Sequence, residues 1–139
     1  MRFLLDASST LQLIKKLEED MALRILSESC VLDLGKYEVG NALWKEHILR
    51  HTITEEEFDE FFRLLTGVII HSKIVRVEAQ DLPDVAKIAA KERITFYDAS
   101  YVEVAKGQKL ILITEDEKLA KAAAKYTKTA TTNDLQREK

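Results

Sequence analysis

Residues 110–116 read Leu-Ile-Leu-Ile-Thr-Glu-Asp, and this stretch decides the fold class of the 139-residue chain. Its uninterrupted apolar run predicts a central strand of a parallel sheet, because such a strand is buried on both faces. A second apolar run, Phe3-Leu-Leu, lies near the N-terminus and ends at Asp6. The carboxyl ends of parallel strands meet at one edge of a sheet, where ligands gather. The two runs therefore predict that Asp6 and Asp116 lie at the same edge.

Strand and helix patterns alternate along the rest of the chain. The expected strands cover residues 2–6, 30–32, 74–77 and 110–113, with an edge strand over 126–131. The expected helices cover residues 9–17, 21–26, 36–50, 54–69, a segment that begins at Asp81, 98–106 and 117–125. This alternation predicts an α/β fold with three layers, in which helices cover both faces of a central, mainly parallel sheet.

Several helix ends carry clear signals. Thr54 is a good N-cap, and Glu57 three residues later completes a capping box. Asp81 is expected to cap a helix that has Pro83 in its first turn. Asp98 is expected to open the next helix, and Gly107 to stop it.

Length and composition bound the class of protein. The chain is 46% apolar and 32% charged, which is typical of a folded globular protein, and its length predicts a single domain over residues 1–139. No apolar stretch approaches the ~20 residues that span a bilayer, and the N-terminus lacks a signal-peptide layout. With a single cysteine as well, the sequence predicts a cytoplasmic protein that does not enter a membrane. The net charge of −3 argues against a large nonspecific grip on nucleic acid.

Four acidic residues lie in apolar settings at the boundaries of the expected elements: Asp6, Glu38, Asp98 and Asp116. Two carboxylates about 4 Å apart repel by roughly 4 kcal/mol at an effective dielectric near 20. A converged group of four therefore favours a divalent cation, and hard oxygen ligands suit Mg²⁺ or Mn²⁺. Taken singly, each acid has a simpler interpretation, as a helix cap or as a solvent-facing side chain.

The segments around these acids resemble the four motifs of PIN-domain nucleases, most closely those of VapC-type toxins of prokaryotic toxin–antitoxin pairs. The segments are Phe3-Leu-Leu-Asp-Ala-Ser8, Tyr37-Glu-Val-Gly-Asn-Ala-Leu43, Tyr97-Asp-Ala-Ser-Tyr101 and Leu112-Ile-Thr-Glu-Asp116. Any one motif is weak, but the four occur in the family's order and spacing and span nearly the whole chain.

The resemblance implies a PIN-like α/β/α domain and a Mg²⁺- or Mn²⁺-dependent endoribonuclease. The family's metal-binding and catalytic acids map onto Asp6, Glu38, Asp98 and Asp116, and its supporting polar positions map onto Ser8, Asn41 and Thr114. A bound metal ion lowers the pKa of a bound water and offsets the charge that grows on the phosphate during cleavage. The implied partners are an RNA substrate, a cognate antitoxin protein and a second copy of the chain in a homodimer.

Two further groups of residues are candidates for partner contacts. The antitoxin groove is expected along the helices over 36–50 and 54–69, with Trp44, Phe58, Phe61 and Phe62 as its aromatic side chains. The same stripe also fits a purely structural role in the core. Lys118, Lys121 and Lys125 follow Asp116 and are candidates for contact with an RNA backbone, although a solvated helix face is their default interpretation.

The sequence is also compatible with other interpretations. A housekeeping PIN nuclease of RNA maturation would carry the same motifs, and so would a binding module of this fold without catalysis. A two-component receiver domain also places aspartates at strand ends, but it needs an acidic pair after its first strand, where this chain has Asp6 alone. His47 and His51 have the i,i+4 spacing of zinc ligands, without an evident third ligand.

Overall fold

The computed structural model describes residues 1–137, and its centre is a sheet of five strands whose neighbours all run parallel. The strands are β1 (Phe3–Leu5), β2 (Ser29–Leu32), β3 (Lys73–Val75), β4 (Ile111–Ile113) and β5 (Thr129–Ala130). Their order across the sheet is β3-β2-β1-β4-β5, so the two apolar runs form neighbouring central strands and β5 is an edge strand. Residues 138–139 of the expected domain over 1–139 lie outside the described part.

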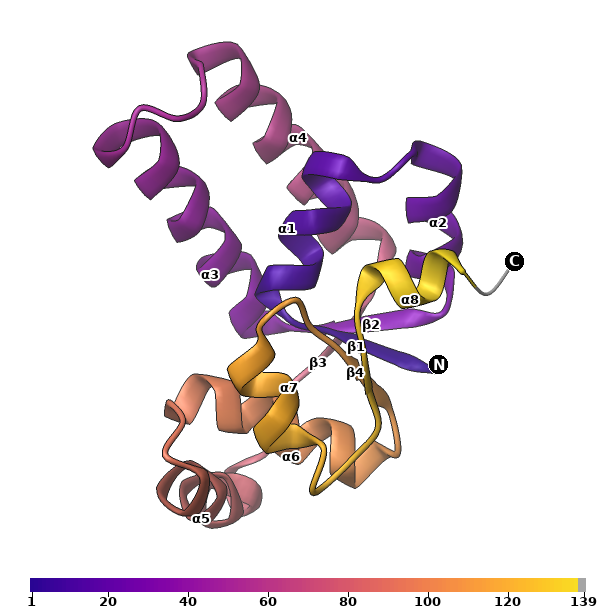
Figure 1. The fold of residues 1–139 in the computed structure, drawn as a ribbon, viewed down its shortest axis with the longest axis vertical. Helices are drawn as coiled ribbons and strands as arrows, with labels where there is room; N and C mark the ends of the chain where they lie inside the picture. The colour runs from indigo at the N-terminus through magenta and orange to yellow at the C-terminus, as the bar shows by residue number, and fades with distance from the viewer. Residues whose placement is uncertain (138–139) are drawn as a thin grey trace.

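Helices cover both faces of this sheet (Figure 1). One layer holds α1 (Ala7–Lys16), α2 (Glu19–Ser27), α3 (Asp33–Trp44), α4 (Glu55–His71) and α8 (Thr132–Gln136). The other layer holds α5 (Leu82–Glu92), α6 (Phe96–Gln108) and α7 (Glu117–Ala123). Helix α3 continues into a π-helical turn, Lys45–Leu49, and pairs with α4 in a hairpin that projects beyond the sheet. The three-layer α/β fold is therefore confirmed.

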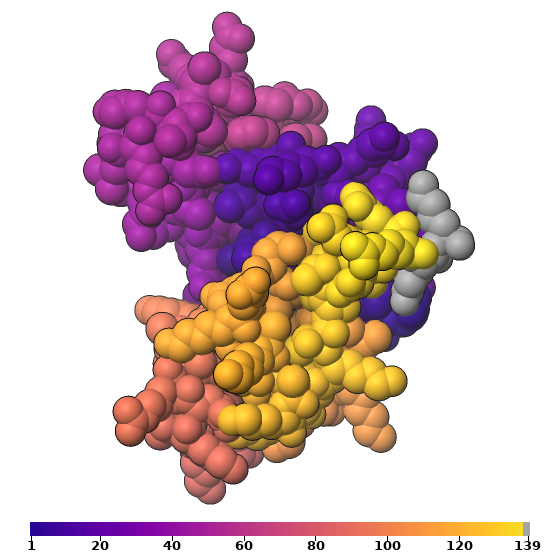
Figure 2. Space-filling view, in the orientation of Figure 1, coloured from indigo at the N-terminus to yellow at the C-terminus, as the bar shows by residue number. Residues whose placement is uncertain are grey.

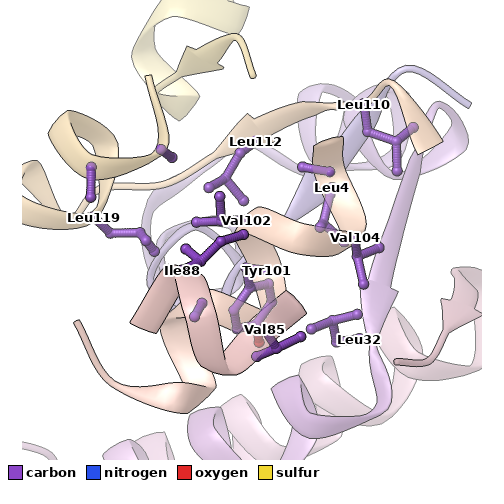
Figure 3. Packing of buried hydrophobic residues seen from close by; sticks show 14 of the residues in the cluster. Leu4, Leu32, Val85, Ile88, Tyr101, Val102, Val104, Leu110, Leu112 and Leu119 are labelled. Carbon is purple, nitrogen blue, oxygen red and sulfur yellow. The ribbon is translucent and has the colours of Figure 1, made fainter. Parts of the chain in front are cut away.

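The side chains of the strands alternate between two hydrophobic clusters. Leu4 and Leu112 pack against α5, α6 and α7 in one cluster (Figure 3), whereas Phe3 and Leu5 point to the other cluster, beneath α1–α4. Each fully buried leucine or phenylalanine stabilises the fold by about 1.5–3 kcal/mol. Because both faces of the sheet are covered, a ligand can reach it only at the ends of its strands.

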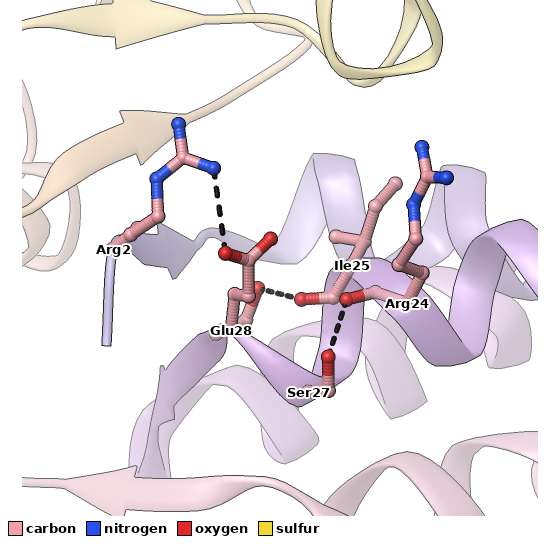
Figure 4. Close-up of polar contacts among 6 residues, drawn as sticks. Arg2, Arg24, Ile25, Ser27 and Glu28 are labelled. Carbon is pink, nitrogen blue, oxygen red and sulfur yellow. Dashed lines mark hydrogen bonds and ion pairs between the residues drawn. The ribbon is translucent and has the colours of Figure 1, made fainter. Parts of the chain in front are cut away.

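At the amino ends of the strands, hydrogen bonds join the start of β1 to the turn that precedes β2. The backbone N–H groups of Arg2 and Phe3 donate to the Glu28 carbonyl over 2.9 and 3.1 Å. The Arg2 guanidinium also lies 3.4 Å from the Glu28 carboxylate, and the Glu28 N–H donates to the Ile25 carbonyl at the end of α2 (Figure 4). These bonds set the register in which Phe3 faces Ser29.

Two expected helix caps differ from the structure. Asp98 does not open α6, because Thr95 is the N-cap and its hydroxyl accepts a 3.0 Å hydrogen bond from the Asp98 N–H. Asp98 therefore lies in the first turn, with its carboxylate left for other contacts. Asp81 directly precedes α5, and Pro83 lies in its first turn, both as expected, but the Asp81 side chain forms no capping hydrogen bond, because the residue ends a short 3₁₀ turn in a helical conformation.

The expected stop of α6 at Gly107 is also wrong. The helix runs through Gln108 and ends at Lys109, which adopts a left-handed conformation with φ 57°. The Leu110 N–H donates to the Ala105 carbonyl over 2.8 Å, so the chain turns where Leu110 must enter the core. Tertiary packing thus places the left-handed residue that ends the helix two positions after the glycine.

Other boundaries differ in smaller ways. Helix α1 begins at Ala7 with Asp6 as its cap, and α3 begins at Asp33, so that Glu38 lies in the second turn instead of opening the helix. The capping box at Thr54 is confirmed. Helix α8 was not expected. Within residues 1–137, no helix combines the length and the apolar character needed to cross a membrane.

Candidate active site

The order of the strands reverses between β1 and β4, because β2 follows on one side of β1 and β4 lies on the other. In open α/β sheets such a reversal leaves a crevice outside the carboxyl ends of the two strands. Asp6 follows β1 directly, and Thr114 and Asp116 follow β4. The fold thus brings two of the four predicted acids to the position where this architecture binds ligands.

The Asp6 carboxylate is buried, and hydroxyl and backbone donors hold it in place. Its Oδ1 accepts hydrogen bonds from the Ser8 hydroxyl at 2.7 Å and from the Ser9 N–H at 2.8 Å, and its Oδ2 accepts one from the Thr114 hydroxyl. Only 4% of the residue is exposed, and this burial raises the pKa of Asp6 in spite of the bonds. The orientation of this carboxylate is therefore set by the fold.

Ser8 and Thr114 also join the segments that follow β1 and β4. Their hydroxyls lie 3.2 Å apart, the Glu115 N–H donates to the Ser8 hydroxyl, and the Asp116 N–H donates to the Thr114 hydroxyl. Asp116 in turn caps α7, because its Oδ1 accepts a 3.1 Å hydrogen bond from the Leu119 N–H. Both hydroxyl residues that the motifs single out thus hold this part of the site together.

Glu38 comes from α3 and is held by a residue that the sequence did not assign a role. The Tyr101 hydroxyl, on α6, donates a 2.7 Å hydrogen bond to Glu38 Oε1. Tyr101 is fully buried, and its surroundings raise the pKa of its hydroxyl far above the ordinary value, so it acts as a neutral donor. The signal for it was present, since Tyr101 closes the segment Tyr97-Asp-Ala-Ser-Tyr101 and lies one helical turn after Asp98.

The close approach of α3 to Tyr101 depends on a glycine. A Cβ atom added to Gly35 would lie 3.3 Å from the Tyr101 hydroxyl oxygen. This separation is tighter than nine in ten real contacts of a Cβ atom. A larger residue would push the hydroxyl away from Glu38, so Gly35 helps to fix the distance between α3 and α6.

The four acids share one electrostatic environment. Burial is the main cause of the raised pKa of Glu38, and the negative charges of Asp98 and Asp6 raise it further. Burial also raises the pKa of Asp98, with further contributions from Asp116 and Asp6. The structure therefore brings the side chains near enough to repel one another. Within residues 1–137, however, no three Asp, Glu, His or Cys side chains lie close enough to hold one metal ion as they stand.

The remaining predicted polar residues lie at different distances from this centre. Asn41 lines a cavity of about 570 Å³ together with Glu38. The Lys118 ammonium lowers the pKa of Asp98, although less than burial raises it, which places Lys118 beside the site. Lys121 is exposed on α7, and Lys125 forms a 2.6 Å ion pair with Glu92, which directs it elsewhere.

The four aromatic residues of the expected antitoxin groove divide into two groups. Trp44 is exposed over 44% of its surface, at the end of α3. Phe58, Phe61 and Phe62 are partly buried and pack against the cluster beneath α1–α4, and the Phe58 ring lies 4.9 Å from that of Phe62. The three phenylalanines therefore contribute to the core between α3 and α4, whereas Trp44 remains available to a partner.

The structure does not support a zinc site formed by His47 and His51. The helical segment after α3 ends at Leu49, and His51 adopts a left-handed conformation beyond it, so the two histidines do not share a helix face. The His47 ring stacks on Phe58 at 4.6 Å, and its Nδ1 lies 3.1 Å from the Ile53 carbonyl. His47 is thus a packing residue.

The chain is a three-layer α/β domain with acidic side chains gathered where its strand order reverses. The sheet order also excludes a receiver domain, whose strands follow the order 2-1-3-4-5. The family model described as "PIN domain" matches residues 3–125, and the chain belongs to the PIN-domain family.

Two relatives come from Pyrobaculum aerophilum. One, named Exonuclease VapC9, is 34% identical over 117 residues, which cover 84% of this chain and 82% of the relative. The other, named Ribonuclease VapC3, is 33% identical over 128 residues, which cover 86% of this chain and 93% of the relative. The similarity thus extends over most of each protein.

Solved structures show the same architecture. The crystal structure of PAE2754 from Pyrobaculum aerophilum superposes with a TM-score of 0.81 at 31% identity, covering 99% of this chain and 96% of that one. The structure of VapBC2 from Rickettsia felis, bound to a DNA fragment from its promoter, gives a TM-score of 0.66 at 11% identity, covering 94% and 98%. At such low identity the second likeness shows the fold alone.

Proposed function

We propose that this chain is a divalent-metal-dependent ribonuclease and the toxin of a VapBC-type toxin–antitoxin pair. The observation that carries this proposal is the convergence of four carboxylates from four separate segments of the chain, Asp6, Glu38, Asp98 and Asp116. Within residues 1–137 none of the four forms an ion pair with a basic side chain. The names of the two relatives agree with nuclease activity.

The chemistry of these four side chains fits a hard divalent cation, and we propose Mg²⁺ or Mn²⁺ as the ion. Mg²⁺ keeps several of its waters and binds through one or two carboxylates, so a closed cage of three protein ligands is not required. When bound, the ion supplies an activated water and offsets the charge that develops on the phosphate. The four acids would hold it, one or two of them directly and the others through its waters.

The protein's own groups prepare the site for this task. Ser8 and Thr114 fix the direction of the Asp6 carboxylate, and Tyr101 fixes that of Glu38. Because hydroxyl donors compensate these carboxylates without neutralising their charge, the acids remain available to a cation. The arrangement therefore favours cation binding over an internal salt bridge.

The test compares RNA cleavage by the parent protein and by Asp98→Asn, with Mn²⁺ and with a chelator. We expect metal-dependent cleavage that Asp98→Asn abolishes, while Glu117→Gln, an exposed acid on α7, leaves it unchanged. A linear and a covalently closed RNA of the same sequence separate internal cleavage, which we propose, from cleavage at an end, since one relative is named an exonuclease. Equal rates for Asp98→Asn and the parent would refute the site.

The partners belong to the same proposal: an RNA substrate, a cognate antitoxin and a second copy of the chain in a homodimer, all in the cytoplasm. A neighbouring gene for a small DNA-binding protein supports the toxin, whereas an isolated gene supports a housekeeping nuclease of RNA maturation. Metal binding in a calorimeter without turnover of any RNA would favour a non-catalytic module instead.

A further inference from the structure

The segment after β4 contains two consecutive acids, Glu115 and Asp116, and the structure directs them to different places. Asp116 is exposed, and besides burial its charge raises the pKa of Asp98. Glu115 is partly buried, and it is not among the charges that raise the pKa of Asp98 or of Glu38. The sequence motifs assign no role to Glu115, so its position needs a separate explanation.

The Glu115 carboxylate binds the start of α8 through one of its oxygens. Its Oε1 accepts a 2.8 Å hydrogen bond from the Thr132 N–H and a 2.7 Å hydrogen bond from the Thr132 hydroxyl. Thr132 is only 1% exposed, and within residues 1–137 Glu115 forms no ion pair with a basic side chain. The carboxylate is therefore used as a hydrogen-bond acceptor, and bonds to a charged acceptor are about twice as strong as those between neutral groups.

Helix α8 is itself held firmly by the rest of the protein. It begins with a capping box between Thr131 and Asp134, and Leu135 is buried in the cluster beneath α1–α4. Figure 2 shows the yellow C-terminal segment lying against the indigo N-terminal segment on one side and the orange segment on the other. A side chain that is tied to the start of α8 is thus tied to the core.

The backbone of the same two acids sets both oxygens of Asp6. The Glu115 N–H donates over 2.9 Å to the Ser8 hydroxyl, which donates to Asp6 Oδ1. The Asp116 N–H donates over 3.0 Å to the Thr114 hydroxyl, which donates to Asp6 Oδ2. Because a hydroxyl that accepts a hydrogen bond becomes a better donor, each chain of bonds is reinforced. The direction of two neighbouring amide groups therefore determines how the Asp6 carboxylate is held.

We propose that Glu115 is a positioning residue, whose carboxylate fastens the segment after β4 to α8 and thereby keeps the Asp6 and Asp116 carboxylates in place for a cation. The side chain of Glu115 is held by Thr132 while its N–H is held by Ser8, so its peptide group cannot turn freely. The inference rests on the proposed metal-dependent function and deepens it, because it makes α8 a support of the site. The role depends on accepting hydrogen bonds and not on negative charge.

The first test measures the affinity for Mn²⁺ by calorimetry in Glu115→Ala and Glu115→Gln. Alanine removes both bonds to Thr132, and we expect the affinity to fall by about tenfold, the lower end of the range for loss of a group that orients a metal ligand. Glutamine places an amide oxygen where Oε1 lies, so it should restore most of the affinity. A glutamine variant as weak as the alanine variant would show that Glu115 acts by its charge, which would overturn the positioning role.

The second test needs no metal ion. Hydrogen exchange followed by NMR reports the protection of the amides of residues 115 and 116, which point to the Ser8 and Thr114 hydroxyls. Glu115→Ala should lower their protection and leave that of the central strands unchanged, because a segment can open without global unfolding. Glu115→Gln should keep it. An equal loss of protection throughout the sheet would mean that Glu115 only stabilises the fold, and the inference would fail.

A second variant and a matched control complete the design. Thr132→Val removes only the hydroxyl donor, so it should lower the affinity for Mn²⁺ less than Glu115→Ala does, and it should add nothing in the Glu115→Ala background. Additive effects of the two changes would contradict the proposed link. Glu57→Ala is the control, since Glu57 accepts a 3.0 Å bond from the Thr54 N–H at the start of α4, near the tip of the hairpin (Figure 1). It should change neither readout.

The outcomes distinguish this inference from the function on which it rests. If the parent binds no Mn²⁺ and cleaves no RNA, but Glu115→Ala alone frees the two amides, the positioning role stands and the nuclease falls. If the parent binds Mn²⁺ and cleaves RNA, and Glu115→Ala does both equally well, the nuclease stands and the role of Glu115 falls.

Discussion

The Asp6 carboxylate has two roles, as the N-cap of α1 and as a member of the acidic centre. Oδ1 caps α1 through the Ser9 N–H, and the same group takes part in the acidic centre that raises the pKa of Glu38 and Asp98. Asp116 combines the cap of α7 with a place beside Asp98 in the same way. The simple interpretation of these acids as helix caps and the functional one are therefore compatible, because a cap fixes a carboxylate at a helix start near the strand end.

The hydrogen bond from Tyr101 to Glu38 leads to a prediction at the scale of a single atom. Tyr101→Phe removes the donor and keeps the ring, so Glu38 should lose its orientation while the core stays filled. We expect the affinity for Mn²⁺, measured by calorimetry, to fall by about 10- to 100-fold, as is typical when a residue that orients a metal ligand is lost. Cleavage should fall in parallel.

A second tyrosine provides the control for that experiment. Tyr126 donates to Glu92 over 2.7 Å, the same distance as in the Tyr101–Glu38 pair, but it lies away from the acidic centre. Tyr126→Phe should leave the affinity for Mn²⁺ unchanged. If both variants bind the ion as the parent does, Tyr101 has only a structural role.

At the scale of the element, the end of α6 shows how packing overrides a local signal. Gly107 is the residue that the sequence singles out as the stop, yet it lies inside the helix, and Lys109 takes the left-handed conformation instead. Glycine in a helix interior costs about 0.5–1 kcal/mol relative to alanine. The chain therefore keeps a local disadvantage at Gly107 that its own fold does not require.

Gly107→Ala should accordingly stabilise the protein by about 0.5–1 kcal/mol. Apart from the neighbouring backbone of the helix itself, no heavy atom lies within 4 Å of the position that a Cβ would take, so the new methyl group meets open space. The free energy of unfolding in urea measures the effect, and Gly35→Ala serves as the opposite case, since its methyl group would crowd Tyr101. Destabilisation by Gly107→Ala would show that the helix ends at the glycine after all.

At the scale of the whole molecule, the helix that carries Glu38 is also proposed to bind a protein partner. Tyr37, Asn41 and Trp44 recur at helical spacing along α3, so the candidate antitoxin groove adjoins the acidic centre on this helix. An antitoxin segment bound beside Trp44 would compete with RNA for this surface. Inhibition would then need no change in the acidic centre itself.

Trp44→Ala tests the partner role of this helix. Because Trp44 is 44% exposed, we expect the melting temperature to change little and the affinity for the cognate antitoxin to fall at least tenfold. Phe58→Ala is the contrasting variant, since Phe58 packs against the cluster beneath α1–α4 and should lower the melting temperature. A Trp44 variant that unfolds earlier but binds normally would make Trp44 a core residue.

The sequence by itself determined the alternation of strands and helices, the two central strands, the capping box at Thr54 and the four acidic segments. These features are local, because hydrophobic periodicity and capping depend on residues within a few positions of one another. The motifs also singled out Ser8 and Thr114, which the fold brings within 3.2 Å of each other. Their roles in metal binding remain a prediction.

Only the tertiary structure decided which contacts complete the site. Tyr101 and Glu38 are 63 positions apart, and Tyr37 and Tyr97 line one cavity from different helices, so no local pattern records these arrangements. The choice of Thr95 over Asp98 as a cap, and the end of α6 at Lys109, likewise follow from how the helix fits the core. The reason is physical: the packing of α3 and α6 on opposite faces of one sheet sets these distances, and packing is a property of the whole chain.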